Sequence, residues 1–316
     1  MKHSDWHIQP YTPERKVAWD EFVTYSKNAT FLFLRNYMEY HANRFTEASL
    51  MIYKGNTLMA LLPGNLEGET FHSHQGLTYG GLLMPSSITY LEVEEALAVA
   101  LIYLRNQLKV RCVCYRAIPH IYHLRPAEED LYALFRLGAS LRGRSLSSVL
   151  TPSQPLPFRQ LRRRQQHRAE QMELQVVHDN DFSAFWPILE ENLMRRHNVH
   201  PVHSLTEIEL LHNRFPHNIK LHRVVSKGCT VGGCVVYETT QVAHVQYIAA
   251  TEEGKRAGAL DLLFAELIHH VYHHKPYFDF GISSLYDGIF LNQGLLFQKE
   301  GFGARAVLYD TYELIL

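Results

Sequence analysis

Short runs of strand character alternate along the chain with longer runs of helical spacing. Residues 88–108 form the strongest helical run, and three glutamates occupy its first turns, where the helix dipole favours acidic side chains. Residues 49–60 instead predict two strands joined by a Lys-Gly-Asn turn at 54–56. The pattern therefore predicts a mixed fold of the α/β (α+β) class.

The second half of the chain repeats the order of elements in the first. A predicted hairpin at 220–237 again has a Lys-Gly turn, and a strand at 242–250 follows it. Tyr247 in that strand stands about where Tyr79 stands in the first half. A helix and a further strand complete the match, so we predict a duplication.

A proline-rich segment separates the two halves. Residues 151–158 (TPSQPLPF) contain three of the 13 prolines of the chain, which is typical of a linker. We therefore predict two domains, 1–155 and 156–316.

Composition excludes several classes of protein. The chain has 316 residues, of which 46% are hydrophobic and 20% charged, as expected of a folded globular protein. Its 31 basic and 32 acidic residues leave a net charge of −1, with no overall bias toward DNA or RNA. No apolar run approaches the ~18 residues of a membrane span, and the N-terminus does not resemble a signal peptide. With only four cysteines, we expect a cytoplasmic protein.

The strand at 242–250 leads directly into a segment suited to an anionic ligand. TEEGKRAGAL (251–260) combines glycines and basic residues immediately before a predicted helix. Free amides at the start of a helix attract phosphate groups, and glycine allows close approach of the backbone. An ordinary connection between strand and helix is the alternative. The predicted donor-binding residues are Ile248, Ala249, Gly254, Lys255, Arg256, Ala257, Gly258 and Ala259.

Two motifs further along resemble a known family. YFDFG (277–281) and GLLFQKEGFGAR (294–305) resemble the C-terminal half of FemAB-like acyltransferases of the GNAT superfamily, and also the BioF-like subgroup. The segment SHQGLTYGG (73–81) extends the resemblance to the first half. The resemblance implies two tandem GNAT-like domains, each a mixed twisted β-sheet flanked by helices. It implies that the first domain is a degenerate, acceptor-side domain and the second is the acyltransferase.

The resemblance leaves two acyl donors open. GNAT proteins that use acetyl-CoA usually carry Arg/Gln-x-x-Gly-x-Gly/Ala in the loop, whereas this chain has Leu260 at the last position. Acetyl-CoA or another acyl-CoA is the expected co-substrate. Fem-type ligases instead use aminoacyl-tRNA, and the five arginines within 158–168 offer a site for tRNA, although a solvated helix explains them equally well.

The reaction requires alignment of amine and carbonyl, stabilisation of an oxyanion and removal of a proton. The resemblance implies that backbone amides at Tyr247, Ile248 and Ala249 stabilise the oxyanion. Lys299, in the second motif, is the predicted side chain for the developing charge, with a surface lysine as the alternative. Tyr286 and His244 are candidates for proton transfer, whereas Asp279 is interpreted as structural.

The resemblance further implies an acceptor site in the cleft between the halves. Its predicted walls are the glycine-rich segment around Tyr79 and the polar loop 195–204; the predicted contacts are Tyr79, Gly80, Gly81, Arg196, His197 and His203. Neither these histidines nor the four at 269–274 have the spacing of a strong zinc motif, so no metal is expected.

The leading hypothesis is an N-acyltransferase acting on a small amine, for example an amino-sugar or cell-envelope precursor. The alternatives are aminoacyl transfer from tRNA to a peptidoglycan-like precursor, and a non-catalytic binding protein with the same fold.

Overall fold

The computed structural model describes residues 5–316, apart from the side chains of Arg196 and His197. It contains two compact units. The first comprises the described residues up to Leu146 together with Ser284–Phe290 and Leu308–Leu316, and the second comprises Ser147–Ser283 and Leu291–Val307. Strands β8 (Ser140–Leu150) and β16 (Arg305–Ile315) therefore contribute residues to both units.

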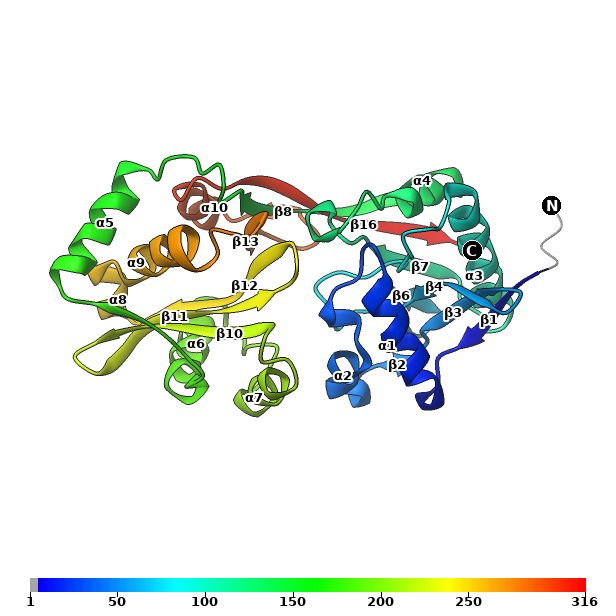
Figure 1. Ribbon diagram of the computed structural model, residues 1–316, viewed down its shortest axis with the longest axis horizontal. Coiled ribbons are helices and arrows are strands. Elements are labelled where there is room, and N and C mark those ends of the chain that lie inside the picture. Colours follow the sequence, from blue (N-terminus) through cyan, green and yellow to red (C-terminus); the bar gives the residue numbers. More distant parts are fainter. Residues whose placement is uncertain (1–4) are drawn as a thin grey trace. The chain divides into compact units, whose positions relative to one another are not determined.

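The first unit contains two groups of strands (Figure 1). One has the order β1-β3-β4, and the other runs β2-β5-β6-β7-β16-β8. The bounds of its elements are β1 Trp6–Pro10, β2 Thr46–Glu47, β3 Leu50–Lys54, β4 Thr57–Leu62, β5 Asn65–Glu67, β6 Thr70–His72 and β7 Cys112–Arg116, with helices α1 Lys16–Tyr25, α2 Arg35–Met38, α3 Tyr90–Asn106 and α4 Glu129–Arg136.

The predictions for hairpin and helix in this unit are confirmed. β3 and β4 pair antiparallel across the expected turn. Helix α3 begins with a capping box, in which Thr89 and Glu92 satisfy each other's backbone amides. Its buried face packs into the core with α4. Thr78-Tyr79, interpreted as the counterpart of a strand, instead lies in an irregular loop.

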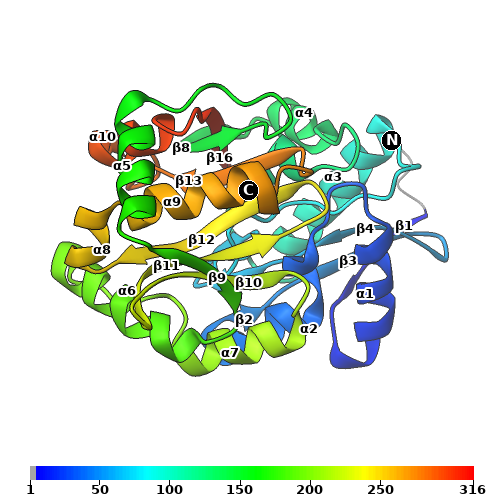
Figure 2. The same cartoon turned by 60° about the vertical axis from the view of Figure 1, so that its left-hand side comes forward.

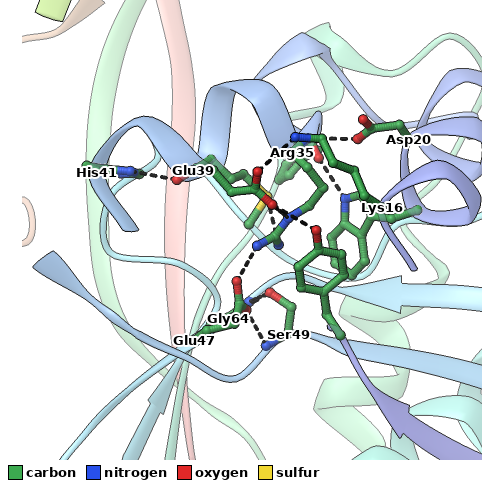
Figure 3. A network of polar contacts seen from close by, with 12 residues as sticks. Lys16, Asp20, Arg35, Glu39, His41, Glu47, Ser49 and Gly64 are labelled. Carbon is green, nitrogen blue, oxygen red and sulfur yellow. Dashed lines mark hydrogen bonds and ion pairs between the residues drawn. The ribbon is translucent and has the colours of Figure 1, made fainter. Parts of the chain in front are cut away.

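A buried arginine organises the segment between α1 and β2 (Figure 3). The side chain of Arg35 is 3% exposed and forms ion pairs with Glu39, at 3.2 Å, and with Glu47. Its backbone N–H donates to Asp20 at 2.7 Å, and Lys16 pairs with Glu39 at 2.8 Å. Because a buried guanidinium is stable only with such partners, this network holds α1 and α2 in place.

The second unit is a sheet with helices on both faces (Figures 1 and 2). Its strand order is β8-β13-β12-β11-β10-β9. Helices α6 and α7 cover one face of the sheet, and helices α5, α8 and α9 cover the other. The bounds are β9 Gln175–Asp179, β10 Ile219–Ser226, β11 Cys229–Glu238, β12 Val242–Ala250 and β13 Tyr277–Ile282, with α5 Gln160–Gln171, α6 Phe182–His197, α7 Leu205–Arg214, α8 Glu252–Ala257, α9 Ala259–Glu266 and α10 Gln293–Glu300. Between β13 and α10 in the sequence, the short strands β14 Ser284–Leu285 and β15 Phe290–Leu291 pair with each other, and all of their residues except Leu291 belong to the first unit.

An aromatic cluster holds α9 on this sheet. The ring of Phe264 lies 4.9 Å from Phe280 and 5.4 Å from Phe302, measured between centroids. Phe278 belongs to the same core. Phe278 and Phe280 of the YFDFG motif thus point toward α9, and Asp279, which lies between them in the strand, points to the opposite face.

The glycine-containing segment 251–260 was predicted to be a loop, but most of it is helical. Residues 252–257 form the short helix α8 directly after β12. Thr251 caps it by accepting a hydrogen bond from the Gly254 N–H at 3.0 Å, which explains why the chain turns helical at once. Gly258, with φ of +83°, then joins α8 to α9.

Candidate active site

Strands β12 and β13 run parallel over three residue pairs and then part. Val242–His244 pair with Tyr277–Asp279, and His244 opposite Asp279 is the last pair. Beyond it, β12 continues along β11 to Ala250, with Gln246 as an extra residue in a bulge. The edge of β12 that faces β13 is therefore no longer paired with that strand after His244. Free backbone amides at such an edge can hold a negatively charged oxygen.

Three polar side chains meet where the strands part. Asp279 is fully buried, and its Oδ2 lies 2.8 Å from Nδ1 of His244. Its Oδ1 accepts from the hydroxyl of Ser147 at 2.5 Å and from the N–H of Gly281 at 2.8 Å. The structure thus brings the predicted residue His244 together with an aspartate that sequence reasoning interpreted as structural.

Lys299 reaches the same strand end from the last turn of α10. It is 6% exposed, so it is not the surface lysine of the alternative interpretation. Its Nζ donates to the carbonyl oxygens of Gly281 at 2.7 Å and Ile282 at 2.8 Å. Burial lowers the pKa of Lys299 to about 8, although the charge of Asp279 opposes this shift. An ammonium group has three donors, so one remains for a substrate oxygen.

Tyr247 and His203 form a buried pair within the second unit. The Tyr247 hydroxyl lies 2.5 Å from Nδ1 of His203, and the tyrosine ring packs against Trp186 at 5.3 Å. Burial raises the pKa of Tyr247 to about 12. The phenol therefore stays neutral near pH 7, where it can donate or accept a hydrogen bond.

The glycines of the predicted phosphate segment make close contacts with the protein itself. A β-carbon on Gly254 would lie 2.1 Å from the carbonyl oxygen of Val231, and one on Gly258 would lie 2.3 Å from that of Gln165. The first turn of α8 carries two glutamates, one of which, Glu252, pairs with Lys255 at 2.8 Å. Ala257 and Ala259 are buried in the core, whereas Arg256 is exposed. The N–H of Gly258 already donates to the carbonyl oxygen of Lys255 at 3.3 Å, and α5 packs directly against its α-carbon, so Gly258 is not an open site for an anion.

A pocket of about 420 Å³ opens beside this segment. Arg162 and Asp261 form an ion pair of 2.9 Å in its wall, and burial raises the pKa of Asp261 to about 6 despite the arginine. The side-chain oxygen of Gln165 is buried in the wall and has no hydrogen-bond partner in the described structure. Helices α5, α8, α9 and α10 supply the lining residues Leu161, Arg162, Gln165, Lys255, Leu260, Asp261, Gly294, Phe297 and Gln298.

The other predicted residues are placed as follows. Ile248 packs on the core beside α9, and Ala249 is buried. In the first unit, Tyr79 is 1% exposed and bonds to Thr30 at 3.1 Å. A β-carbon on Gly80 or Gly81 would strike Ser73 or Tyr115, so both glycines permit close packing; Tyr286, also of this unit, is 77% exposed. The side chains of Arg196 and His197 lie outside the described residues. Substrate contacts at these positions stay predictions.

Sequence reasoning missed Ser147, Arg162, Gln165 and Asp261 as site residues. Only Arg162 carried a signal, as one of the arginines of 158–168. In residues 5–316 no group of three or more His, Cys, Asp or Glu side chains is placed to hold a metal ion. No helix among the described residues is both long and apolar enough to cross a bilayer.

Comparison with known proteins supports the expected family. Residues 158–287 match the model of the acetyltransferase (GNAT) domain. No curated protein sequence matches the chain. Among solved structures, FemX has a TM-score of 0.67 at 12% identity, covering 98% of this chain and 97% of its own. L-PGS from Bacillus licheniformis has a TM-score of 0.62 at 13% identity, and the alignment covers 97% of this chain and 92% of its own.

A tandem GNAT protein from the clavulanic acid biosynthesis pathway is also similar. Its TM-score is 0.57 at 10% identity, and the alignment covers 98% of both chains. At such identities these structures establish the fold alone, and that fold extends over both units. The comparisons support the superfamily expected from the two sequence motifs: the chain contains an acetyltransferase (GNAT) domain at residues 158–287, and its fold resembles those of FemX and of the tandem GNAT protein.

Proposed function

We propose that the second unit transfers an acyl group from acyl-CoA to an amine. The observation that supports this most directly is the meeting of His244 and Lys299 at the point where β12 and β13 part. A base and a cation next to free strand amides are the groups that attack of an amine on a thioester requires.

In the proposed reaction, the nitrogen of the amine attacks the thioester carbonyl while His244 accepts its proton. The carbonyl oxygen becomes an oxyanion, held by amides of β12 near Ile248 and by the remaining donor of Lys299. The carbon–sulfur bond then breaks, and the thiolate of CoA takes up a proton. The products are an amide and free CoA.

The pocket beside α9 is the proposed donor site. Arg162 and Lys255 supply positive charge for phosphate groups there, and Gln165 offers an unpaired acceptor. Because Gly258 is covered by α5, the phosphates would contact these side chains rather than the glycine amides that the sequence suggested.

The first unit, which contains most of the predicted domain 1–155, is proposed to serve the acceptor. It lacks a basic glycine segment like 251–258 and a lysine in the position of Lys299. An amino-sugar or a cell-envelope precursor is the proposed class of acceptor, and the cytoplasm the proposed location.

Acetyl-CoA and a panel of amines test this function, with release of free thiol as the signal. We expect thiol release that depends on the amine and that falls strongly in Lys299→Ala. Absence of CoA binding by calorimetry would exclude the donor.

Variants of two adjacent residues can distinguish CoA binding in this pocket from a general attraction of CoA to positive charge. Lys255 lines the pocket, whereas the exposed Arg256 does not. Loss of a hydrogen bond to a charged group costs about 1.5–3 kcal/mol, or roughly 10-fold or more in affinity. Lys255→Met should weaken CoA binding to that extent and Arg256→Met should not. Equal effects would contradict the assignment of the pocket.

A second function, aminoacyl transfer from tRNA, is favoured by the surface of α5. Arg163, Arg164 and Arg168 are exposed, and no ion pair is assigned to them within the described residues. Three free cations on one helix suit a phosphate backbone. This function predicts tRNA binding that weakens steeply with salt and is lost when the three arginines become glutamine. Unchanged binding in that variant would exclude it.

A further inference from the structure

The carboxylate of Asp279 is held in one orientation by donors on both of its oxygens. Oδ1 accepts from the Ser147 hydroxyl and the Gly281 N–H, while Oδ2 lies 2.8 Å from Nδ1 of His244. The residue is fully buried, and its charge is felt by Lys299, whose ammonium form it favours. An ionised carboxylate can only accept hydrogen bonds, so all three neighbours must donate to it.

This requirement determines where the proton of neutral His244 resides. Nδ1 must carry hydrogen in order to donate to Oδ2, which leaves Nε2 with its lone pair. The histidine side chain is 10% exposed, and no hydrogen bond is assigned to Nε2 among the described residues. Nε2 is therefore the nitrogen able to take a proton from a ligand.

We infer that Asp279 is a positioning residue that sets the tautomer and the ring orientation of His244 for proton transfer. The inference rests on the proposed function, in which His244 is the base. It adds that the carboxylate of Asp279 keeps Nε2 of His244 free to accept the proton. Asp279 does not contact the reacting atoms; it acts through His244. Ser147 and Gly281 act one step further out, since they fix the plane of the carboxylate.

Replacement of Asp279 by asparagine keeps the shape of the side chain but changes which of its atoms can donate, and it also removes the charge that favours the ammonium form of Lys299. The Gly281 N–H still requires an acceptor, so the amide oxygen of Asn occupies the place of Oδ1. Its NH2 group then faces Nδ1 of His244, which has to become an acceptor, and the ring proton moves to Nε2. A histidine protonated on Nε2 cannot accept a proton from the amine.

Nitrogen-15 NMR of the full-length protein with labelled histidine measures the tautomer without substrate. The chain has 20 histidines, so the spectrum of His244→Gln identifies the signals of His244. Spectra are taken at a pH high enough that these signals no longer shift. We expect Nδ1–H in the wild type and in Ser147→Ala, which keeps the Gly281 and His244 bonds, and Nε2–H in Asp279→Asn.

Nε2–H in the wild type, or Nδ1–H retained in a folded Asp279→Asn variant, overturns the inference. If the variant does not fold, the tautomer of the wild type alone decides. If Asp279 had only a structural role and did not orient His244, the wild type would show a mixture of both histidine tautomers. That result would also overturn the inference.

The acyl-transfer assay supplies a separate result. Positioned bases contribute about 10²–10⁴-fold to rate, so kcat of Asp279→Asn should fall at least about 100-fold while KM for acyl-CoA changes little. A switched tautomer with unchanged kcat would exclude His244 as the base but leave its positioning by Asp279 intact. Absence of acyl transfer in the wild type would refute the proposed function, and the NMR result would still decide the inference.

Discussion

Gly258 is the position at which α5 and the proposed donor segment depend on each other most directly. Its φ is +83°, a left-handed conformation that costs a residue with a β-carbon about 1–2 kcal/mol. In Gly258→Ala the new β-carbon would also lie 2.3 Å from the carbonyl oxygen of Gln165, a backbone atom that cannot move without α5. Such overpacking costs about 1–3 kcal/mol. The expected loss of stability is therefore about 2–5 kcal/mol.

Gly228 provides a matched control in the same unit. It has the same φ of +83°, but a β-carbon there would meet nothing within 4 Å. Gly228→Ala should thus lose only the conformational part, about 1–2 kcal/mol. The difference between the two variants isolates the contact between α5 and Gly258.

Urea unfolding followed by circular dichroism measures both free energies of unfolding, and hydrogen exchange of the α5 amides shows where the strain is relieved. We expect faster exchange in α5 of Gly258→Ala alone. If the two variants lose equal stability and α5 exchanges as in the wild type, α5 does not pack against Gly258.

Three further predictions concern titration and hydrogen bonding in the second unit. Acyl transfer should decline as pH rises through about 8, because the Lys299 cation is lost there, and Lys299→Arg should remove this decline from the pH profile of kcat; an identical profile would exclude a role for the lysine charge. Asp261, with its pKa raised to about 6 by burial, binds its proton more tightly when folded. The free energy of unfolding should therefore decrease from about pH 4 to about pH 6, and this decrease should be smaller in Asp261→Asn when measured by urea unfolding across that range. Tyr247→Phe removes the hydrogen bond to His203 and should lower the free energy of unfolding by about 1 kcal/mol, whereas no loss would show that the bond contributes nothing.

Local patterns in the sequence were sufficient for several elements. The β3–β4 hairpin follows from its turn residues, and α3 follows from its spacing and its capping box. The two motifs were sufficient to suggest the GNAT superfamily, and the acetyltransferase (GNAT) domain model matches residues 158–287, which include YFDFG but not Lys299. These features depend on residues that are close together in the chain, so they can be predicted without knowledge of the tertiary structure.

The polar strand β8 was not predicted, because its structure depends on residues far away in the sequence. SLRGRSLSSVL, in β8, is mostly polar and shows no regular alternation, so nothing local marks it as a strand. Its state depends on pairing with β13, which is distant in sequence. Likewise, 251–258 was interpreted as a loop because of its glycines, although Thr251 caps a helix there.

The chemistry of the site depended on tertiary contacts most of all. The sequence shows that His244 and Lys299 are present, and the family motif directs attention to the lysine, but neither indicates a partner. Asp279 becomes a partner of His244 only because β12 and β13 pair in one register, and a shift by one residue would point the two side chains to opposite faces. Whether Gly258 receives a phosphate or the backbone of α5 was decided in the same way. A glycine is required in either case, because a β-carbon would block a phosphate as well as the α5 backbone. Only the tertiary packing shows that the carbonyl oxygen of Gln165 lies against Gly258.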